Sequence, residues 1–291
     1  MSGPAPGSEL RGIALLCMAL VFFSALDTIA KYLAADLPVL QIVWVRFLTH
    51  AVFMVAIFRP RRTLSCLVSA NLRLQLARAV LLFSTTVFNF LAVRELQLSV
   101  TVSIMFTAPL LIAALSVPLL GEIVGARRWA AIVVGFIGVV LVTKPGFADF
   151  SWATVYSFAA AGCFALYAIA TRMVARFDSA LTTILYTPLA GVVVLAPAMP
   201  FIWVSPSGSL DWGLLIVTGA LGGYGHYLMV LAHRIAPAAL LAPFIYTQIV
   251  SMVFLGLIIF GDIPAVNTLI GAAIVIASGL YLLYRTGRAK T

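Results

Sequence analysis

The sequence predicts an all-α polytopic membrane protein of ten transmembrane helices, built as two inverted repeats of five helices. Of its 291 residues, 63% are hydrophobic and only 9% are charged, whereas a soluble domain carries about 25% charged residues. Ten apolar runs are each long enough to cross roughly 30 Å of hydrocarbon as a helix. The two halves of the chain also match one another after a shift of 140 residues, which lays Thr107 onto Thr247.

The ten apolar runs divide the chain into its expected elements. Prolines, glycines and charged residues separate them, as in Arg59-Pro60, Lys144-Pro145 and Gly261-Asp262. The expected spans are residues 12–33, 39–58, 74–93, 98–120, 127–144, 152–173, 181–203, 211–232, 237–260 and 264–284. We therefore assign a first repeat to residues 12–145, a second to residues 146–285, and short cytoplasmic tails to residues 1–11 and 286–291.

The formal charge of +9 reflects membrane topology rather than a nucleic-acid partner. The basic residues stand singly or in pairs between apolar runs, with no continuous stripe that could follow a phosphate backbone. With a cytoplasmic N-terminus, fourteen Lys and Arg residues, Arg78 among them, fall on inner segments, three fall on outer segments, and Arg46 lies within a span. This bias predicts that both termini are cytoplasmic, in what we expect to be a bacterial inner membrane.

The internal repeat indicates how the two halves insert. Arg94 corresponds to Arg234, and Gly121 corresponds to Gly261. Because each half contains an odd number of spans, the second half must insert upside down. Inverted repeats of this kind are a recurring plan of transporters, with the binding site near the membrane midplane.

Three stretches resemble the EamA-type, ten-helix branch of the drug/metabolite transporter superfamily. They are Val100–Lys144, with its Pro109 and Gly121-Glu122; its repeat partner Ala236–Leu280; and the Trp44-Val45-Arg46 step. The second copy departs from the pattern, with Ile249 in place of Pro109 and Asp262 in place of the usual Glu. The resemblance covers nearly the whole chain.

This resemblance implies a secondary transporter that works by alternating access through a central cavity between the repeats. Its expected cargo is a small metabolite, in the first place an amino acid moving outwards. The stretch DTIAKYL…PVLQIVWVR, from Asp27, is also similar to members that take up riboflavin or S-adenosylmethionine, so import of an aromatic cofactor is the alternative. The expected partners are the substrate and the bilayer, with no cofactor. A monomer and an oligomer both remain open.

Three ionisable residues are expected within the first two spans. Asp27 and Arg46 lie at similar predicted depth, and His50 follows Arg46 by one helical turn. Ionisable groups inside a membrane are costly and mark functional positions. Asp27, Arg46 and His50 are therefore candidates for coupling or gating. The alternative is a structural ion pair between Asp27 and Arg46 that fixes one helix against the other.

The run 211–232 combines close packing with polar rings. Gly219 and Gly223 form a GxxxG face that permits close helix contact. Tyr224 and His226 follow directly and are candidates for the cavity wall, while simple packing is the alternative. The other cavity candidates are polar or aromatic residues of the remaining spans: Asn89, Ser103, Phe106, Thr107, Tyr167, Tyr246 and Gln248.

Other classes of function find little support in the sequence. An integral membrane enzyme would need a nucleophile with its base or a metal cluster, yet no HExxH or GxSxG pattern occurs. The cysteines Cys17, Cys66 and Cys163 are isolated and predict neither a disulfide nor a metal site. A receptor or assembly protein would not need an inverted duplication. We therefore expect a protein without catalytic activity.

Overall fold

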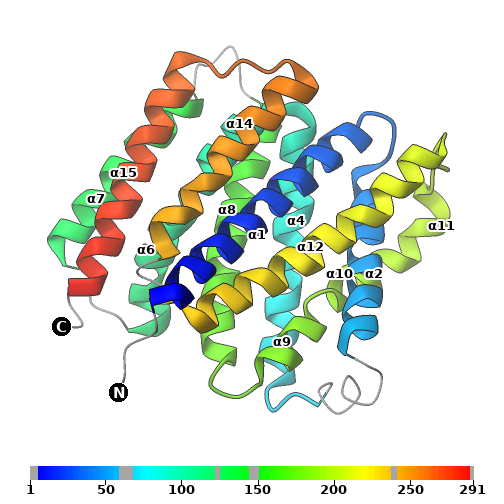
Figure 1. The fold of residues 1–291 in the computed structure, drawn as a ribbon, viewed down its shortest axis with the longest axis horizontal. Helices are drawn as coiled ribbons and strands as arrows, with labels where there is room; N and C mark the ends of the chain where they lie inside the picture. Colours follow the sequence, from blue (N-terminus) through cyan, green and yellow to red (C-terminus); the bar gives the residue numbers. More distant parts are fainter. Residues whose placement is uncertain (1–5, 59–67, 122–124, 144–150, 237–240, 289–291) are drawn as a thin grey trace. The chain divides into compact units, whose positions relative to one another are not determined.

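The computed structural model describes residues 6–58, 68–121, 125–143, 151–236 and 241–288 (Figure 1). All regular elements in these ranges are helices. They are α1 (Pro6–Leu33), α2 (Val39–Phe58), α4 (Leu72–Glu95), α5 (Leu98–Met105), α6 (Ala108–Leu120), α7 (Ala126–Thr143), α8 (Trp152–Val174), α9 (Ala180–Tyr186), α10 (Leu189–Leu195), η1 (Ala196–Ala198), α11 (Met199–Ile202), α12 (Ser209–Ile235), η2 (Ala242–Tyr246), α14 (Thr247–Phe260) and α15 (Val266–Arg288).

These helices confirm the predicted all-α membrane fold. Within the described ranges, seven helical segments are long and apolar enough to cross a membrane, and three shorter apolar helices lie at Trp129–Val142, Phe244–Phe260 and Val266–Tyr281. The long and short segments together fall on the ten predicted runs. Helix α1 already begins at Pro6 and α15 continues to Arg288, so both helices extend beyond the predicted spans 12–33 and 264–284.

Three of the ten spans are broken rather than continuous. The run 98–120 divides into α5 and α6 at Phe106-Thr107, the run 181–203 divides first at Thr187-Pro188, and the run 237–260 changes from η2 to α14 after Tyr246. Proline lacks the N–H that a continuous helix needs. Pro109 and Pro188 lie at or next to two of these breaks, so the sequence does carry their local cause.

The repeat is visible in the backbone at Gly121 and Gly261. These residues correspond under the 140-residue shift, and they adopt φ angles of 67° and 68°. Each ends its helix in the left-handed conformation that glycine adopts without strain. The amide of Gly121 donates to the carbonyl of Val117, and that of Gly261 donates to Leu257, at 3.1 Å in both cases.

The helices form two compact units. The first unit comprises residues 1–28, 96–151 and 224–291, and the second comprises residues 29–95 and 152–223. Each unit therefore takes helices from both halves of the sequence, and α1 and α12 contribute to both units. The sequence repeats are not the compact units, although each unit contains pairs of equivalent helices, such as α7 with α15 in the first.

In the first unit, α7 and α15 run side by side and antiparallel (Figure 1). A Cβ on Gly138 would lie 2.8 Å from the carbonyl oxygen of Gly271, and the hydroxyl of Ser278 donates to the carbonyl of Ala131. The 140-residue shift converts the first contact into the second, because Gly138 maps onto Ser278 and Ala131 onto Gly271. Equivalent helices that pack antiparallel are the arrangement that inverted repeats require.

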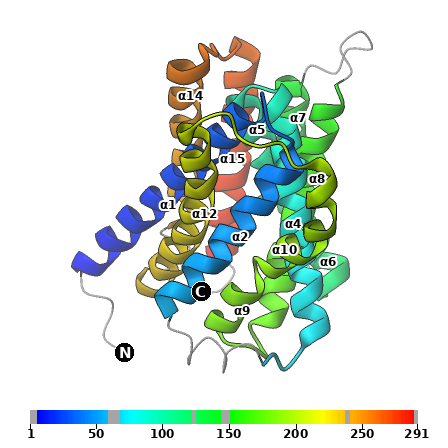
Figure 2. The same cartoon turned by 90° about the vertical axis from the view of Figure 1, so that its right-hand side faces the viewer.

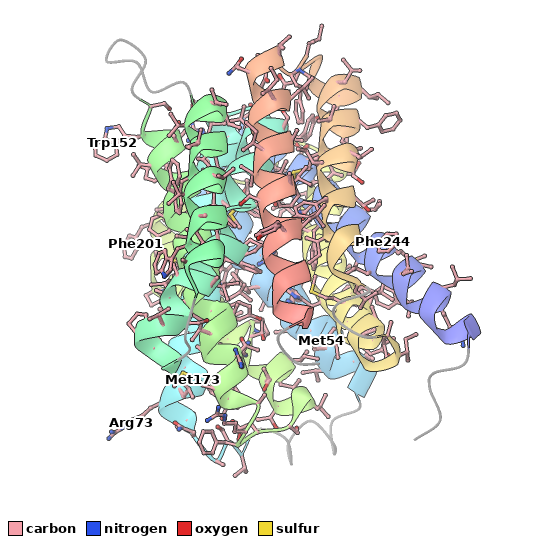
Figure 3. All side chains as sticks on the ribbon, turned by 90° about the vertical axis from the view of Figure 1, so that its left-hand side faces the viewer. Met54, Arg73, Trp152, Met173, Phe201 and Phe244 are labelled. Atoms are coloured by element: carbon pink, nitrogen blue, oxygen red, sulfur yellow. The ribbon has the colours of Figure 1, made fainter. Side chains whose placement is uncertain are left out.

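In the second unit, α4 packs along α8, and α2 packs on α10 (Figure 2). The rings of Phe88 and Tyr156 stack between α4 and α8 at 6.2 Å. The side chain of Phe47 fills the space beside Gly191, where a Cβ would come within 2.2 Å of its ring. Figure 3 shows Arg73, near the start of α4, and Trp152, at the start of α8, at opposite ends of this unit, as expected for an antiparallel pair.

Candidate substrate site

Helix α1 contacts the broken span that contains η2 and α14 within the first unit. The hydroxyl of Ser24 lies 3.5 Å from the carbonyl oxygen of Gln248, and Cys17 Sγ lies 3.8 Å from Thr247 Oγ1. Ser24 also donates to the carbonyl of Leu20 in its own helix. The contact falls at the start of α14, beside the helix break, where backbone geometry departs from a regular helix.

A cluster of rings joins α1 to the C-terminal part of α12. The rings of Phe23 and His226 are 5.0 Å apart, and those of Phe22 and Tyr224 are 6.2 Å apart. Gly225 admits this contact, because a Cβ there would lie 2.8 Å from the ring of Phe23. Tyr224 keeps 47% of its surface exposed. We call these rings the α1–α12 ring cluster, which comprises Phe22, Phe23, Tyr224, His226 and Tyr227.

The structure thus brings the predicted candidates Tyr224, His226 and Gln248 close to one helix, α1. The residues of α1 that they contact, above all Phe23 and Ser24, were not among the predicted site residues. One signal could have identified them: both precede Asp27 by one helical turn and so share its face of α1.

Phe106 and Tyr246 contact each other inside the first unit. Their rings meet edge to face at 5.0 Å and 82°, and the two residues correspond under the 140-residue shift. Both are buried, and the hydroxyl of Tyr246 lies against Gly279 of α15. The pair joins the two helix breaks of this unit. Contact of either ring with substrate stays a prediction.

Ser103 and Thr107 are fully buried in the first unit. The hydroxyl of Ser103 donates to the carbonyl of Ser99 at 2.6 Å, and that of Thr107 donates to Ile104 at 2.7 Å. Each hydroxyl is therefore satisfied by its own helix, which is the usual arrangement for these side chains in a span.

Arg46 is buried in the second unit. Its Nη1 donates to Thr86 Oγ1 at 3.1 Å, and its guanidinium carbon lies 4.7 Å from the ring centre of Phe47 and 5.9 Å from that of Phe90. Asp27 belongs to the first unit, so the ion pair between Asp27 and Arg46 stays a prediction.

The GxxxG face of α12 makes the predicted close helix contact, and its partner is α2. A Cβ on Gly219 would lie 2.7 Å from the carbonyl oxygen of Arg46, and one on Gly223 would lie 3.1 Å from the ring of His50. His50 is almost completely buried at this helix crossing. The imidazole ring of His50 is thus enclosed between α2 and α12. Its role in coupling stays a prediction.

Arg78 is a buried residue that was not among the predicted site residues. It was counted on a cytoplasmic segment, but it lies within the apolar helix α4 and is the largest fully buried side chain of the described residues. Its guanidinium donates to Tyr167 Oη, Thr187 Oγ1, the carbonyl of Thr183 and Gln75 Oε1. One cation thereby ties together α4, α8 and the broken span that contains α9.

Tyr167, a predicted cavity residue, is part of this network, since its ring also lies 5.3 Å from the Arg78 guanidinium. Asn89, the remaining candidate, lies two turns or more away on α4 and is partly buried. Within this unit, both the hydroxyl and the ring of Tyr167 contact the guanidinium of Arg78. Its contact with substrate stays a prediction.

The Arg78 network reaches the end of the unit through Gln75 and Asp178. Gln75 Nε2 donates to Asp178 Oδ2 at 2.8 Å, and the same carboxylate accepts from the hydroxyl of Ser69 and the amide of Ala70. Burial alone would raise the pKa of Asp178, but these three hydrogen bonds outweigh it and lower the pKa. The carboxylate therefore stays charged and holds the turn after α8 to the start of α4.

Comparison with known proteins identifies the family of this chain. The model of the EamA-like transporter family matches residues 10–144 and, a second time, residues 151–285. The S-adenosylmethionine uptake transporter of Rickettsia conorii is 29% identical over 284 residues, which cover 96% of this chain and 95% of that protein. The riboflavin transporter of Vibrio cholerae is 28% identical over 186 residues, 62% of this chain and 61% of that protein.

Two further comparisons extend along the whole chain. The pseudopaline exporter of Pseudomonas aeruginosa is 22% identical over 272 residues, 93% of this chain and 95% of that protein. The crystal structure of another protein shares the fold, with a TM-score of 0.65 and 18% identity over 98% of this chain and 99% of that one. With both repeats matched, the chain belongs to the EamA-like transporter family.

Proposed function

We propose that this protein takes up S-adenosylmethionine, or a small molecule of the same charge and aromatic character, across the membrane. The observation that carries the proposal is the full-length similarity to S-adenosylmethionine uptake transporters. Our first expectation, export of amino acids, finds no support among these relatives, and the import alternative fits them better.

The chemistry of the first unit suits such a substrate. S-adenosylmethionine carries a sulfonium cation next to a flat adenine ring. Aromatic faces attract cations and stack on flat rings, and the α1–α12 ring cluster offers several. Asp27 lies one turn beyond Phe23 on the same face of α1, so its carboxyl group lies near these rings. The amide side chain of Gln248 adds hydrogen-bonding groups at the adjacent helix break.

Riboflavin is the second candidate, because the riboflavin transporter of Vibrio cholerae matches over 62% of this chain. Its flat ring system would stack on the same rings, but it carries no cationic centre. The two candidates therefore differ in their dependence on Asp27, which a neutral substrate would need far less.

Uptake into proteoliposomes tests the proposal. Labelled S-adenosylmethionine should accumulate in vesicles that contain the protein, and excess unlabelled compound should block it. S-adenosylhomocysteine, which lacks the cationic sulfur, should compete about tenfold less well, since about 1.4 kcal/mol of cation–π and charge attraction is lost. Asp27→Asn and Phe23→Ala should each reduce uptake, with Asp211→Asn, in the first turn of α12, and the exposed Phe254→Ala as matched controls.

Transport of riboflavin but not S-adenosylmethionine would favour the second candidate. Flux of amino acids alone, in a folded preparation, would restore the export hypothesis and contradict both import candidates. Repeating the assay with and without a proton gradient examines the predicted coupling role of Asp27 and His50.

A further inference from the structure

The amide of Gln248 differs from those of the other glutamines in apolar helices. Both sides of the Gln41 amide bond the backbone of Val204, and both sides of the Gln75 amide are bonded as well. Among the residues that the structure describes, none bonds the side chain of Gln248, although its backbone carbonyl oxygen accepts from Ser24 at 3.5 Å. An unpaired amide in an apolar span is costly, so this one is open to a polar group that enters from outside the chain.

Gln248 lies on the inward face of α14. It is followed at intervals of four by Met252 and Gly256, which are both buried, and a Cβ on Gly256 would lie 4.0 Å from that of Leu98 in α5. The exposed side chains lie on the opposite face of the helix: Val250, Phe254 and Ile258. Gln248 is itself only partly exposed, so its face turns towards the unit rather than towards lipid.

This position adjoins the α1–α12 ring cluster. Ser24, whose hydroxyl reaches the carbonyl oxygen of Gln248, directly follows Phe23 in α1. The ring of Phe23 in turn lies 5.0 Å from that of His226. A flat substrate ring stacked on this cluster would therefore have the start of α14 beside it.

The fold does not require a glutamine at this position. Under the 140-residue shift, Gln248 corresponds to Ala108, and each lies in the first turn of a helix that follows a break. Each of these helices also ends at a glycine of positive φ, Gly121 or Gly261. Because alanine suffices in the first repeat, the amide in the second repeat is available for a role that the first repeat does not share.

We propose that the amide of Gln248 binds the edge of the adenine ring of the substrate and makes the transporter selective for 6-aminopurines. This assignment rests on the proposed uptake of S-adenosylmethionine. A glutamine amide presents a donor N–H beside an acceptor oxygen, and adenine presents the complementary pair in its 6-amino group and a neighbouring ring nitrogen. The ring cluster accepts the flat face of many aromatic compounds, whereas hydrogen bonds along the edge distinguish one ring from another.

Inhibition of labelled S-adenosylmethionine uptake into proteoliposomes by two competitors tests the proposal. One is S-adenosylhomocysteine, and the other is its analogue without the 6-amino group. S-adenosylhomocysteine should inhibit about tenfold more strongly, because the analogue leaves the amide oxygen of Gln248 without a donor.

Two substitutions of Gln248 remove the amide in different ways. Gln248→Ala copies Ala108 of the first repeat, and Gln248→Met keeps the length of the side chain. Each should abolish the preference between the competitors and raise the KM for S-adenosylmethionine about tenfold with little change in the maximal rate, as the loss of a binding contact does. Gln97→Met is the matched control and should change neither value, since Gln97 precedes Leu98, which lies beside Gly256, two turns along α14 from Gln248.

Equal inhibition by the two competitors in the unmodified protein would overturn this assignment and leave the proposed function intact, since uptake itself is retained. A preference that survives in both Gln248 variants, or that is lost equally in Gln97→Met, would overturn it in the same way. Absence of S-adenosylmethionine uptake by the unmodified protein would overturn the proposed function and the role of Gln248 together.

Discussion

At the scale of single residues, Arg78 shows what a buried cation does in this fold. Its donors reach one acceptor on its own helix and three on two other segments of the second unit. Hydropathy alone could not predict this, because an arginine near the end of an apolar run looks like a residue at the membrane surface. Its acceptors at Tyr167, Thr183 and Thr187 are about 90 to 110 positions away in sequence, and only tertiary structure brings them together.

Replacing Arg78 should destabilise the protein strongly. Arg78→Met leaves several buried acceptors without a donor, and each such group costs about 1–3 kcal/mol. We expect a loss of at least about 3 kcal/mol in the free energy of unfolding. Arg78→Lys should recover only part of it, because an ammonium lacks the planar fork that serves several acceptors. Unfolding by denaturant in detergent measures both values.

Arg73→Met is the matched control for Arg78→Met. Arg73 lies on the same helix but projects outwards and is exposed (Figure 3). Its removal should change the stability by less than about 0.5 kcal/mol. Equal effects of the two substitutions would show that the Arg78 network contributes nothing specific.

At the scale of helices, length and composition predicted most of the structure because the bilayer dictates how long an apolar run must be. The break inside the run 181–203 was missed for a related reason. A break at Thr187-Pro188 does not interrupt the hydrophobicity of the run 181–203, so an average over that run does not detect it. The break is instead indicated by Pro188 itself, because proline lacks the backbone N–H that a continuous helix needs.

The close packing at Gly219 and Gly223 is an element-scale feature that the sequence did predict, although it did not identify α2 as the partner helix. Gly219→Ala should destabilise the protein by about 1–3 kcal/mol, because its new methyl group would overlap the backbone of His50 and Arg46, which cannot move aside. Gly213→Ala, in open space on the same helix, should instead stabilise it by up to about 1 kcal/mol. Thermal unfolding of the two variants should therefore shift in opposite directions, and a parallel shift would contradict the close crossing.

At the scale of the whole chain, the repeat explains why equivalent positions recur as contacts. Gly138 and Gly271 meet on α7 and α15, and so do their equivalents Ser278 and Ala131. The 140-residue shift predicted the correspondence, and the odd number of spans predicted its inversion. Neither could predict that the compact units would mix helices of both repeats, because that depends on tertiary packing rather than on the order of the spans.

Inversion leads to a prediction about topology. Arg78 is buried and no longer counts as a surface charge, yet thirteen basic residues on the predicted inner segments still outnumber three on the outer ones. The bias therefore still predicts that both termini are cytoplasmic.

In a Gram-negative host, green fluorescent protein fused after Thr291 should fluoresce, and alkaline phosphatase fused there should be inactive. The same reporters after residue 147, which follows five spans, should give the opposite pair of results. Active phosphatase after Thr291 would mean an odd number of spans or a reversed insertion, and either outcome would contradict two inverted repeats with a cytoplasmic N-terminus.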